Sequence, residues 1–344
     1  MDFNKGLIEW YRTYRRDLPW RKTREPYRIW LSEVILQQTR VEQGSRYYEA
    51  FLHRFPTIQD LADASEEEVL NMWQGLGYYT RARNLHRTAR YIAYERNGEF
   101  PSEFEELLGL RGIGPYTAAA IASFSFGQRT PVVDGNVERV IARLHGVEEA
   151  VNSNKGKRRI QRLASDLMGT ADPGVFNQAI MEFGALQCTS KNPACGTCPF
   201  QNDCRAFWNG KAEFLPIKRK GKKQRHRYFN YLYLRNEEGT VLEKRTEKDI
   251  WQHLYQLPLI ESEYPVRERE LREQFLPCPP FYGTLPSSLE LEAEFRHTLS
   301  HQRIHARFWR IPIPEKDWPE GWIQVSEEEL AEFALPRLIE RFLS

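Results

Sequence analysis

Four of the five cysteines in this chain fall within seventeen residues, and this cluster constrains the fold more than any other feature of the sequence. Cys188, Cys195, Cys198 and Cys204 have the spacing C-x6-C-x2-C-x5-C, whereas Cys278 stands apart. Thiols crowded in this way in a reducing compartment usually share a metal centre. Structural zinc sites commonly use two short C-x2-4-C knuckles, and only one is present here. The spacing therefore favours an iron–sulfur cluster over zinc, with unligated thiols as a third alternative.

The length and the distribution of charge predict two domains. The chain has 344 residues, more than the usual domain size of about 100–200 residues. Residues 218–227 carry seven basic side chains and no acidic one, whereas residues 228–344 are acidic overall. We therefore expect a first domain over 1–217, a linker over 218–227 and a second domain over 228–344. The basic linker either lies near a polyanion or is simply solvated.

Hydrophobic periodicity predicts that the first domain is all-α and that the second contains strands. Helical spacing of apolar residues recurs in Gly6–Arg16, Tyr27–Tyr48, Ser65–Gln74, Arg81–Arg96, Glu103–Leu110, Pro115–Phe126, Val137–Leu144, Arg158–Leu167 and Val175–Gln187. After the linker, strand patterns occur at Tyr228–Arg235, Thr240–Arg245, Tyr282–Leu285 and Ala306–Ile311, with a hairpin between the first two, and helical patterns occur at Pro265–Phe275 and Glu327–Phe342. The second domain is therefore expected to be α/β or α+β.

The sequence carries no signal for export or membrane insertion. No apolar run approaches the ~20 residues of a membrane helix, and the first residues lack the pattern of a secretory or transit peptide. We expect a cytoplasmic protein with no membrane partner.

A glycine-rich turn joins two predicted helices in the segment Leu110–Ala118. Gly112 and Gly114 allow a ligand to approach the backbone closely, and Pro115 suits the first position of the following helix. The free amides at that helix start favour an anion such as a DNA phosphate. An ordinary turn between helices is the alternative.

A second glycine-containing loop, Gly75–Arg83, is rich in aromatic and arginine side chains. Such side chains can wedge between bases while arginines hold phosphates, which enzymes that act on bases need in order to take their target out of the stack. A plain helix–helix connection explains the loop equally well.

Two carboxyl groups are candidates for paired acid and anion chemistry. Glu33 lies in the largely apolar segment Ile29–Thr39, where desolvation raises the pKa of a carboxyl group and can keep it protonated, as a general acid requires. A structural ion pair with Arg21 or Arg28 is the alternative. Asp134 precedes a predicted helix and could face a developing cation, although a role as helix N-cap would explain it alone.

Taken together, these segments resemble the MutY family of adenine-specific DNA glycosylases, within the helix-hairpin-helix superfamily that includes endonuclease III. The motifs that carry the resemblance are Ser32–Thr39, Gly75–Tyr79, the glycine-rich turn, Val133–Asn136 and the four clustered cysteines. The resemblance implies an all-α helix-hairpin-helix glycosylase domain that holds a [4Fe–4S] cluster. It also implies removal of adenine mispaired with 8-oxoguanine or guanine in double-stranded DNA. We expect a monomer that is associated with the nucleoid when bound to DNA.

The resemblance assigns roles to individual residues. Glu33 is the acid that protonates the departing adenine, Asp134 faces the cationic sugar, and Tyr116 and Asn136 support these two carboxyl groups. The adenine pocket is expected to contain Trp20, Arg21 and Gln178. DNA contacts are expected from Gln38, Thr39, Leu76, Tyr78, Gly112, Gly114 and Lys191, and of these Gln38, Leu76 and Tyr78 match residues wedged around the oxidised guanine.

The residue type at position 116 distinguishes two kinds of enzyme within the superfamily. In the related lyases the corresponding position holds a lysine that attacks the sugar, and a phenol cannot form that Schiff base. The sequence therefore predicts a glycosylase without strong strand cleavage. The alternatives are an endonuclease III-like pyrimidine glycosylase and AP lyase, and a non-enzymatic iron–sulfur DNA-binding module; the pair Glu33 and Asp134 counts against the second of these.

Residues 228–344 resemble the Nudix-like recognition domain of these glycosylases. The Nudix box is only partly present: Glu261, Arg269–Leu271 and Glu273 fit it, whereas Tyr255, Gln274 and Leu276 do not. Loss of a carboxylate weakens a site for a hard cation, so we expect no Nudix hydrolase activity. Ser300 and His301 align with the family's Phe-Ser-His loop and are the expected readers of 8-oxoguanine, although Leu299 replaces the Phe.

Overall fold

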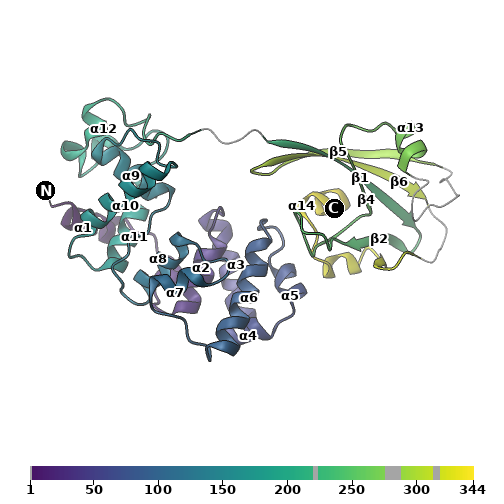
Figure 1. The fold of residues 1–344 in the computed structure, drawn as a ribbon, viewed down its shortest axis with the longest axis horizontal. Helices are drawn as coiled ribbons and strands as arrows, with labels where there is room; N and C mark the ends of the chain where they lie inside the picture. The colour runs from purple at the N-terminus through teal and green to yellow at the C-terminus, as the bar shows by residue number, and fades with distance from the viewer. Residues whose placement is uncertain (1, 220–223, 276–287, 313–317) are drawn as a thin grey trace. The chain divides into compact units, whose positions relative to one another are not determined.

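The computed structural model describes residues 2–219, 224–275, 288–312 and 318–344, which belong to two compact units. The first unit consists of Met1–Asp63 and Asn84–Lys220, and the second consists of Ala64–Arg83 and Gly221–Ser344. Helices make up most of the first unit, and a sheet forms the centre of the second (Figure 1). Within the described ranges, no helix is long and apolar enough to cross a membrane.

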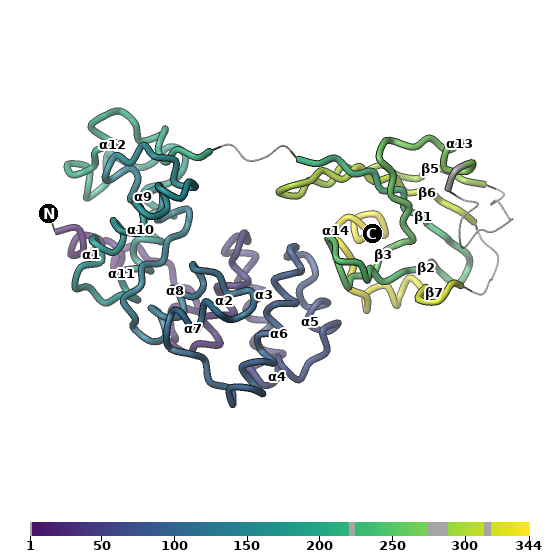
Figure 2. Tube along the Cα trace, viewed as in Figure 1, coloured from purple at the N-terminus to yellow at the C-terminus, as the bar shows by residue number. Residues whose placement is uncertain are grey.

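The first unit is built from short helices and the loops that join them (Figure 2). They are α1 Phe3–Tyr14, α2 Pro26–Ile35, α3 Val41–Arg54, α4 Ile58–Asp63, α7 Phe104–Gly109, α8 Pro115–Phe124, α9 Gly135–His145, α10 Asn154–Met168, α11 Pro173–Leu186 and α12 Arg205–Trp208. Another helix, α6 Thr80–Glu95, begins in the second unit and ends in the first. Prolines begin α2, α8 and α11, where the missing N–H has no intrahelical partner to lose.

Packing between these helices brings distant candidate residues together. Helix α11 packs against α1 and α9 around a core that includes Leu7, Ile141, Phe176 and Ile180, all fully buried. Helix α2 packs against α8. As a result, the helices that carry Glu33, Tyr116, Asp134 and Gln178 surround one region of the unit.

The predicted helix over Tyr27–Tyr48 is wrong, because the chain breaks between α2 and α3. Gln38 lies in the break with φ at 58°, a left-handed conformation that a right-handed helix cannot contain. Helix α4 was not predicted, and its six residues are too few for a clear periodic pattern.

The second unit is organised around a seven-stranded sheet with the order β3-β2-β1-β6-β5, where β4 also pairs with β1 and β7 with β2. The strands are β1 Arg225–Asn236, β2 Gly239–Lys244, β3 Tyr255–Gln256, β4 Leu259–Ser262, β5 Glu290–Thr298, β6 Gln302–Pro312 and β7 Trp322–Val325. Strands β1 and β6 are parallel. The hairpin predicted between β1 and β2 is confirmed, with Arg235 opposite Thr240.

Successive residues of a strand point to opposite faces of a sheet, and here apolar side chains lie on both faces. Phe229, Tyr231 and Phe308 belong to one core, which α14 (Arg337–Leu343) covers, and Leu232 and Trp309 belong to the other. Helix α5, Glu66–Met72, also lies in this unit.

Several predicted elements of the second unit differ from the structure. Strand β1 begins at Arg225, inside the segment predicted as linker. The predicted helix over Pro265–Phe275 is a short α13, Glu268–Glu270, followed by a π-helical turn, and the predicted helix over Glu327–Phe342 is interrupted before α14, where Pro336 is the N-cap. The predicted strand at 282–285 lies outside the described residues.

Candidate active site

Glu33 lies on α2 with 6% of its surface exposed. Burial raises the pKa of its carboxyl group from 4.5 to about 7. A hydrogen bond with Tyr116 opposes this shift, the charge of Asp134 adds to it and the charge of Arg21 opposes it. The direction of the shift agrees with the sequence prediction, so Glu33 carries a proton for much of the time at neutral pH.

Asp134 is the N-cap of α9, and the cap fixes the direction of its carboxylate. Its Oδ1 accepts hydrogen bonds from the backbone N–H groups of Asn136 at 2.9 Å and Val137 at 2.8 Å, and its Oδ2 accepts one from the Asn136 side chain at 2.7 Å. Burial raises the pKa of Asp134, while these hydrogen bonds and the charge of Arg139 oppose the rise. Capping and a catalytic role are therefore compatible, since the cap supplies the donors that favour the charged form.

Two adjoining cavities share Glu33, Tyr116 and Asp134 in their walls. The first, of about 220 Å³, is also lined by the predicted pocket residues and two further candidates: Trp20, Arg21, Gln178, Asn136 and Thr39. The second, of about 580 Å³, is also lined by Gln38, Gly112 and Gly114. The structure thus joins the predicted adenine pocket, the two carboxyl groups and the glycine-rich turn.

Gly112 has a positive φ of 78°, and a Cβ atom there would lie 2.6 Å from the Cβ of Asn84. Only glycine fits this close approach. The turn ends in Gly114, the N-cap of α8, so the first amides of α8 follow it directly.

Glu182 is a buried charged residue that the sequence analysis missed. The guanidinium of Arg21 donates two hydrogen bonds to its carboxylate, at 2.9 and 2.8 Å, and Arg16 donates as well. Burial opposes ionisation, but the hydrogen bonds from Arg21 and Arg16 outweigh it and lower the pKa of Glu182 to about 2. The signal was present in the sequence, because Glu182 interrupts an apolar helical segment just as Glu33 does.

The ion pair proposed as the alternative role for Glu33 does not form with Arg21, which pairs with Glu182. The Nε atom of Arg28 lies 3.9 Å from Oε2 of Glu25 instead. Within the described residues, neither arginine forms a salt bridge with Glu33.

The residues expected near the opposite base lie in the second unit, except Gln38. Leu76 is buried and Tyr78 is 48% exposed, both on the loop between α5 and α6. Ser300 and His301 are exposed in the turn between β5 and β6, where the Ser300 hydroxyl lies 3.2 Å from Nδ1 of His301.

The four clustered cysteines line one small cavity of about 30 Å³ in the first unit. Arg143 approaches it, with Nη1 3.4 Å from the Sγ of Cys188, and Lys191 is exposed on the same loop. Four thiolates are the ligand set that a [4Fe–4S] cluster takes, so the residues that line this cavity fit that group.

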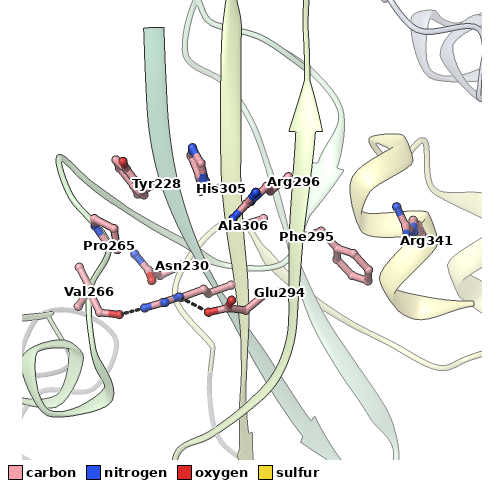
Figure 3. Close-up of a pocket in the computed structure, with 11 residues that line it drawn as sticks. Tyr228, Asn230, Pro265, Val266, Glu294, Phe295, Arg296, His305, Ala306 and Arg341 are labelled. Atoms are coloured by element: carbon pink, nitrogen blue, oxygen red, sulfur yellow. Dashed lines mark hydrogen bonds and ion pairs between the residues drawn. The ribbon is translucent and has the colours of Figure 1, made fainter.

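The sheet of the second unit bears a separate cavity of about 500 Å³, shown in Figure 3. Tyr228 and His305 line it, and Arg307 forms an ion pair with Glu294 at 2.6 Å. Neither Ser300 nor His301 is among its lining residues, so the predicted reading turn is distinct from it.

The surviving Nudix-box residues are engaged in local contacts. The guanidinium of Arg227 donates to Glu261 at 2.7 Å, Arg269 donates to Glu273 at 2.7 Å, and Glu270 accepts from a backbone N–H of its own helix start. These carboxylates therefore already have partners within the protein.

Three family models match the chain in succession. Residues 31–168 match the HhH-GPD superfamily of base excision DNA repair proteins, residues 188–204 match the iron–sulfur binding domain of endonuclease III, and residues 230–344 match the NUDIX domain. The predicted fold class and the predicted [4Fe–4S] cluster are confirmed, and the matched range 188–204 contains the four clustered cysteines.

Curated relatives and solved structures extend this similarity. The chain is 34% identical over 350 residues to the adenine DNA glycosylase of Buchnera aphidicola subsp. Acyrthosiphon pisum, covering 99% of this chain and 96% of that protein. It is 46% identical over 213 residues to the human adenine DNA glycosylase, covering 59% of this chain and 39% of the human protein. A thermostable thymine-DNA glycosylase structure has a TM-score of 0.56 at 29% identity, covering 60% of this chain and 95% of the other.

Proposed function

The chain belongs to the adenine DNA glycosylases, and we propose that Glu33 and Asp134 divide the excision of adenine between them. The observation that carries this proposal is the shared cavity wall, which contains both a carboxyl group with a pKa of about 7 and a capped aspartate. Active sites that need one protonated acid and one carboxylate anion commonly use two carboxyl groups whose environments give them different pKa values.

Glu33 acts as the general acid. Adenine leaves poorly as an anion, so a ring nitrogen must receive a proton while the glycosidic bond breaks. Such proton transfer typically contributes ~10²–10⁴-fold to a rate. The hydroxyl of Tyr116, whose pKa burial raises well above its ordinary value, stays protonated and hydrogen-bonds to Glu33.

Asp134 stabilises the cationic sugar that forms as the bond lengthens. A fixed carboxylate in a site that excludes water is worth more than one in solvent, because it needs no reorganisation during the reaction. Asn136 holds Asp134 in place and is itself held by Arg139, whose Nη2 donates to its Oδ1 at 2.8 Å.

Adenine is expected to occupy the cavity bounded by Trp20, Arg21 and Gln178. Gln178 is oriented by Tyr11, whose hydroxyl donates to its Oε1 at 2.8 Å. The glycine-rich turn, Thr39 and the cluster loop with Lys191 hold the DNA backbone in this proposal. Because both carboxyl groups come from one chain, a monomer suffices, and its substrate places it at the chromosome.

The base opposite the adenine is 8-oxoguanine or guanine in this proposal. Gln38, Leu76 and Tyr78 surround it and Ser300 and His301 read it, while residues 1–217 perform excision and residues 228–344 perform recognition. The test is single-turnover cleavage of duplexes with adenine opposite 8-oxoguanine, guanine, thymine and cytosine. We expect fast excision opposite 8-oxoguanine, slower excision opposite guanine and little opposite the pyrimidines. Equal rates on all four duplexes would refute the recognition role.

Borohydride trapping on abasic DNA tests the lyase alternative. Tyr116 cannot form a Schiff base, so we expect no efficiently trapped covalent complex. Efficient trapping would instead favour a glycosylase that is also a lyase.

A further inference from the structure

The segment Ala64–Arg83 belongs to the same compact unit as the C-terminal sheet, although more than 130 residues separate them in sequence. Its side chains donate hydrogen bonds to three backbone carbonyls near the C-terminal sheet: Asn71 to Glu332, Tyr79 to Leu335 at 3.1 Å, and Arg83 to Gln252. Two further contacts add to these: Nδ1 of His253 lies within hydrogen-bond distance of the Glu66 carboxylate, and Glu67 forms an ion pair with Lys244 at 3.9 Å. The segment is therefore anchored both before and after its central loop.

The central loop, Gly75–Tyr78, is called the wedge loop here because it carries Leu76 and Tyr78. The residues that flank it shape it: the indole N–H of Trp73 donates to the Gly77 carbonyl at 3.0 Å, and Arg81 donates to the Leu76 and Gly77 carbonyls at 3.3 and 3.2 Å. Positive φ angles at Gly75, Gly77 and Tyr78 fix its path. The loop is thus one body with its flanks, and its position depends on what anchors the flanks.

Tyr79 is the anchor nearest to the wedge loop. It is 5% exposed, and the Leu335 carbonyl that accepts its hydrogen bond belongs to a residue that is 4% exposed. If the Tyr79 hydroxyl moved away, the buried Leu335 carbonyl would have neither this donor nor water as a hydrogen-bond partner. Such a loss costs free energy, so the hydrogen bond resists a shift of the residues that flank the wedge loop. This hydrogen bond joins the residue next to Tyr78 directly to the C-terminal chain.

We infer that the C-terminal domain acts on the opposite base in part through the wedge loop, with Tyr79 as the positioning residue. The inference rests on the proposed function, in which Leu76 and Tyr78 surround that base. Apart from Gln38, the residues proposed for the two sides of the mispair then lie in different units. The adenine-side residues Glu33, Tyr116 and Asp134 lie in the first unit, whereas the wedge loop and the turn with Ser300 lie together in the second.

The test compares Tyr79→Phe with the matched control Tyr94→Phe in the full chain. Tyr94 lies on the same helix, is 49% exposed and hydrogen-bonds to Asp63, away from the C-terminal contacts. Tyr79→Phe should lower the ratio of single-turnover rates opposite 8-oxoguanine and opposite guanine about five- to tenfold, mainly through the 8-oxoguanine duplex. Amides of the wedge loop should also exchange hydrogen faster, while Tyr94→Phe changes neither measurement. Asn71→Ala should act in the same direction.

A double-mutant cycle with Tyr78→Ala separates the inference from the proposed function. If Tyr79 acts through Tyr78, then Tyr79→Phe adds nothing to the loss of the rate ratio already caused by Tyr78→Ala. A Tyr78→Ala variant with an unchanged ratio would overturn the proposed role of Tyr78. If Tyr78→Ala lowers the ratio but Tyr79→Phe and Asn71→Ala leave both the ratio and the amide exchange unchanged, the inference is wrong.

Discussion

Replacing Glu33 with glutamine should abolish adenine excision and make the folded protein more stable above pH 7. The pKa of Glu33 is about 7 in the folded protein against an ordinary value of 4.5. Below pH 4.5 the group is protonated in both the folded and the unfolded state. As the pH rises, the unfolded state loses its proton first, so stability falls until the pH passes 7. At about 1.36 kcal/mol per pKa unit, the shift costs about 3 kcal/mol of folding free energy at pH 8, which a non-titrating glutamine avoids.

The assay combines urea unfolding of wild type and Glu33→Gln between pH 5 and pH 8 with single-turnover excision over the same range. The stability advantage of the variant should grow with pH, and the wild-type rate should fall toward tenfold per unit above pH 7 as the acid loses its proton. Glu182→Gln is the matched control, because the pKa of Glu182 is lowered to about 2 and its charge therefore stabilises the fold at neutral pH. This second variant should be less stable than wild type. A Glu33→Gln enzyme that kept a tenth of the wild-type rate, or was less stable at pH 8, would refute the reasoning.

Three further substitutions and one truncation test other parts of the proposal. Asp134→Asn should lose excision but keep duplex affinity, since asparagine is also a good N-cap; a rate within tenfold of wild type would exclude a catalytic anion. Cys198→Ser should lower iron content from about four per chain and weaken duplex binding, because Lys191 sits on the same loop; unchanged iron would contradict the cluster ligation. A fragment ending near Pro216 should excise adenine with little preference for 8-oxoguanine, whereas Ser300→Ala should cost at most about tenfold in that preference. An equal loss of excision rate on both mispairs after truncation would indicate that the removed segment has a general role in DNA affinity or folding.

Local chemistry made part of the site predictable from sequence. Glu33 stood out because a carboxyl group in an apolar helix is desolvated wherever that helix packs, and Asp134 because an aspartate before a helix caps it. The partner of Arg21 was not predictable, since Glu182 lies far from it in sequence and only the packing of α11 brings them together. The break at Gln38 was hidden because neither glycine nor proline, the usual breaker residues, occurs between Leu36 and Val41.

The grouping of Ala64–Arg83 with the C-terminal sheet was equally inaccessible to sequence reasoning. The contacts that define it run from side chains to backbone carbonyls, and any residue supplies a carbonyl. The residue types at Gln252 and Leu335 therefore do not predict these hydrogen bonds. Long-range packing, and not local propensity, decides which unit the wedge loop joins.

Glu182 also bears on the acid itself, because it binds the guanidinium of Arg21, which lines the same cavity as Glu33. An arginine within about 4–6 Å of a carboxyl group lowers its pKa by about 1–3 units, which would leave Glu33 ionised and useless as an acid at neutral pH. In the structure Arg21 already lowers the pKa of Glu33 slightly, while two hydrogen bonds commit its guanidinium to Glu182. Glu182→Gln should release Arg21 toward Glu33 and move the alkaline limb of the pH–rate profile to lower pH by about one unit or more. Single-turnover rates from pH 5 to pH 9 measure this shift. An unshifted profile with a uniformly lower rate would show that Glu182 only shapes the adenine pocket.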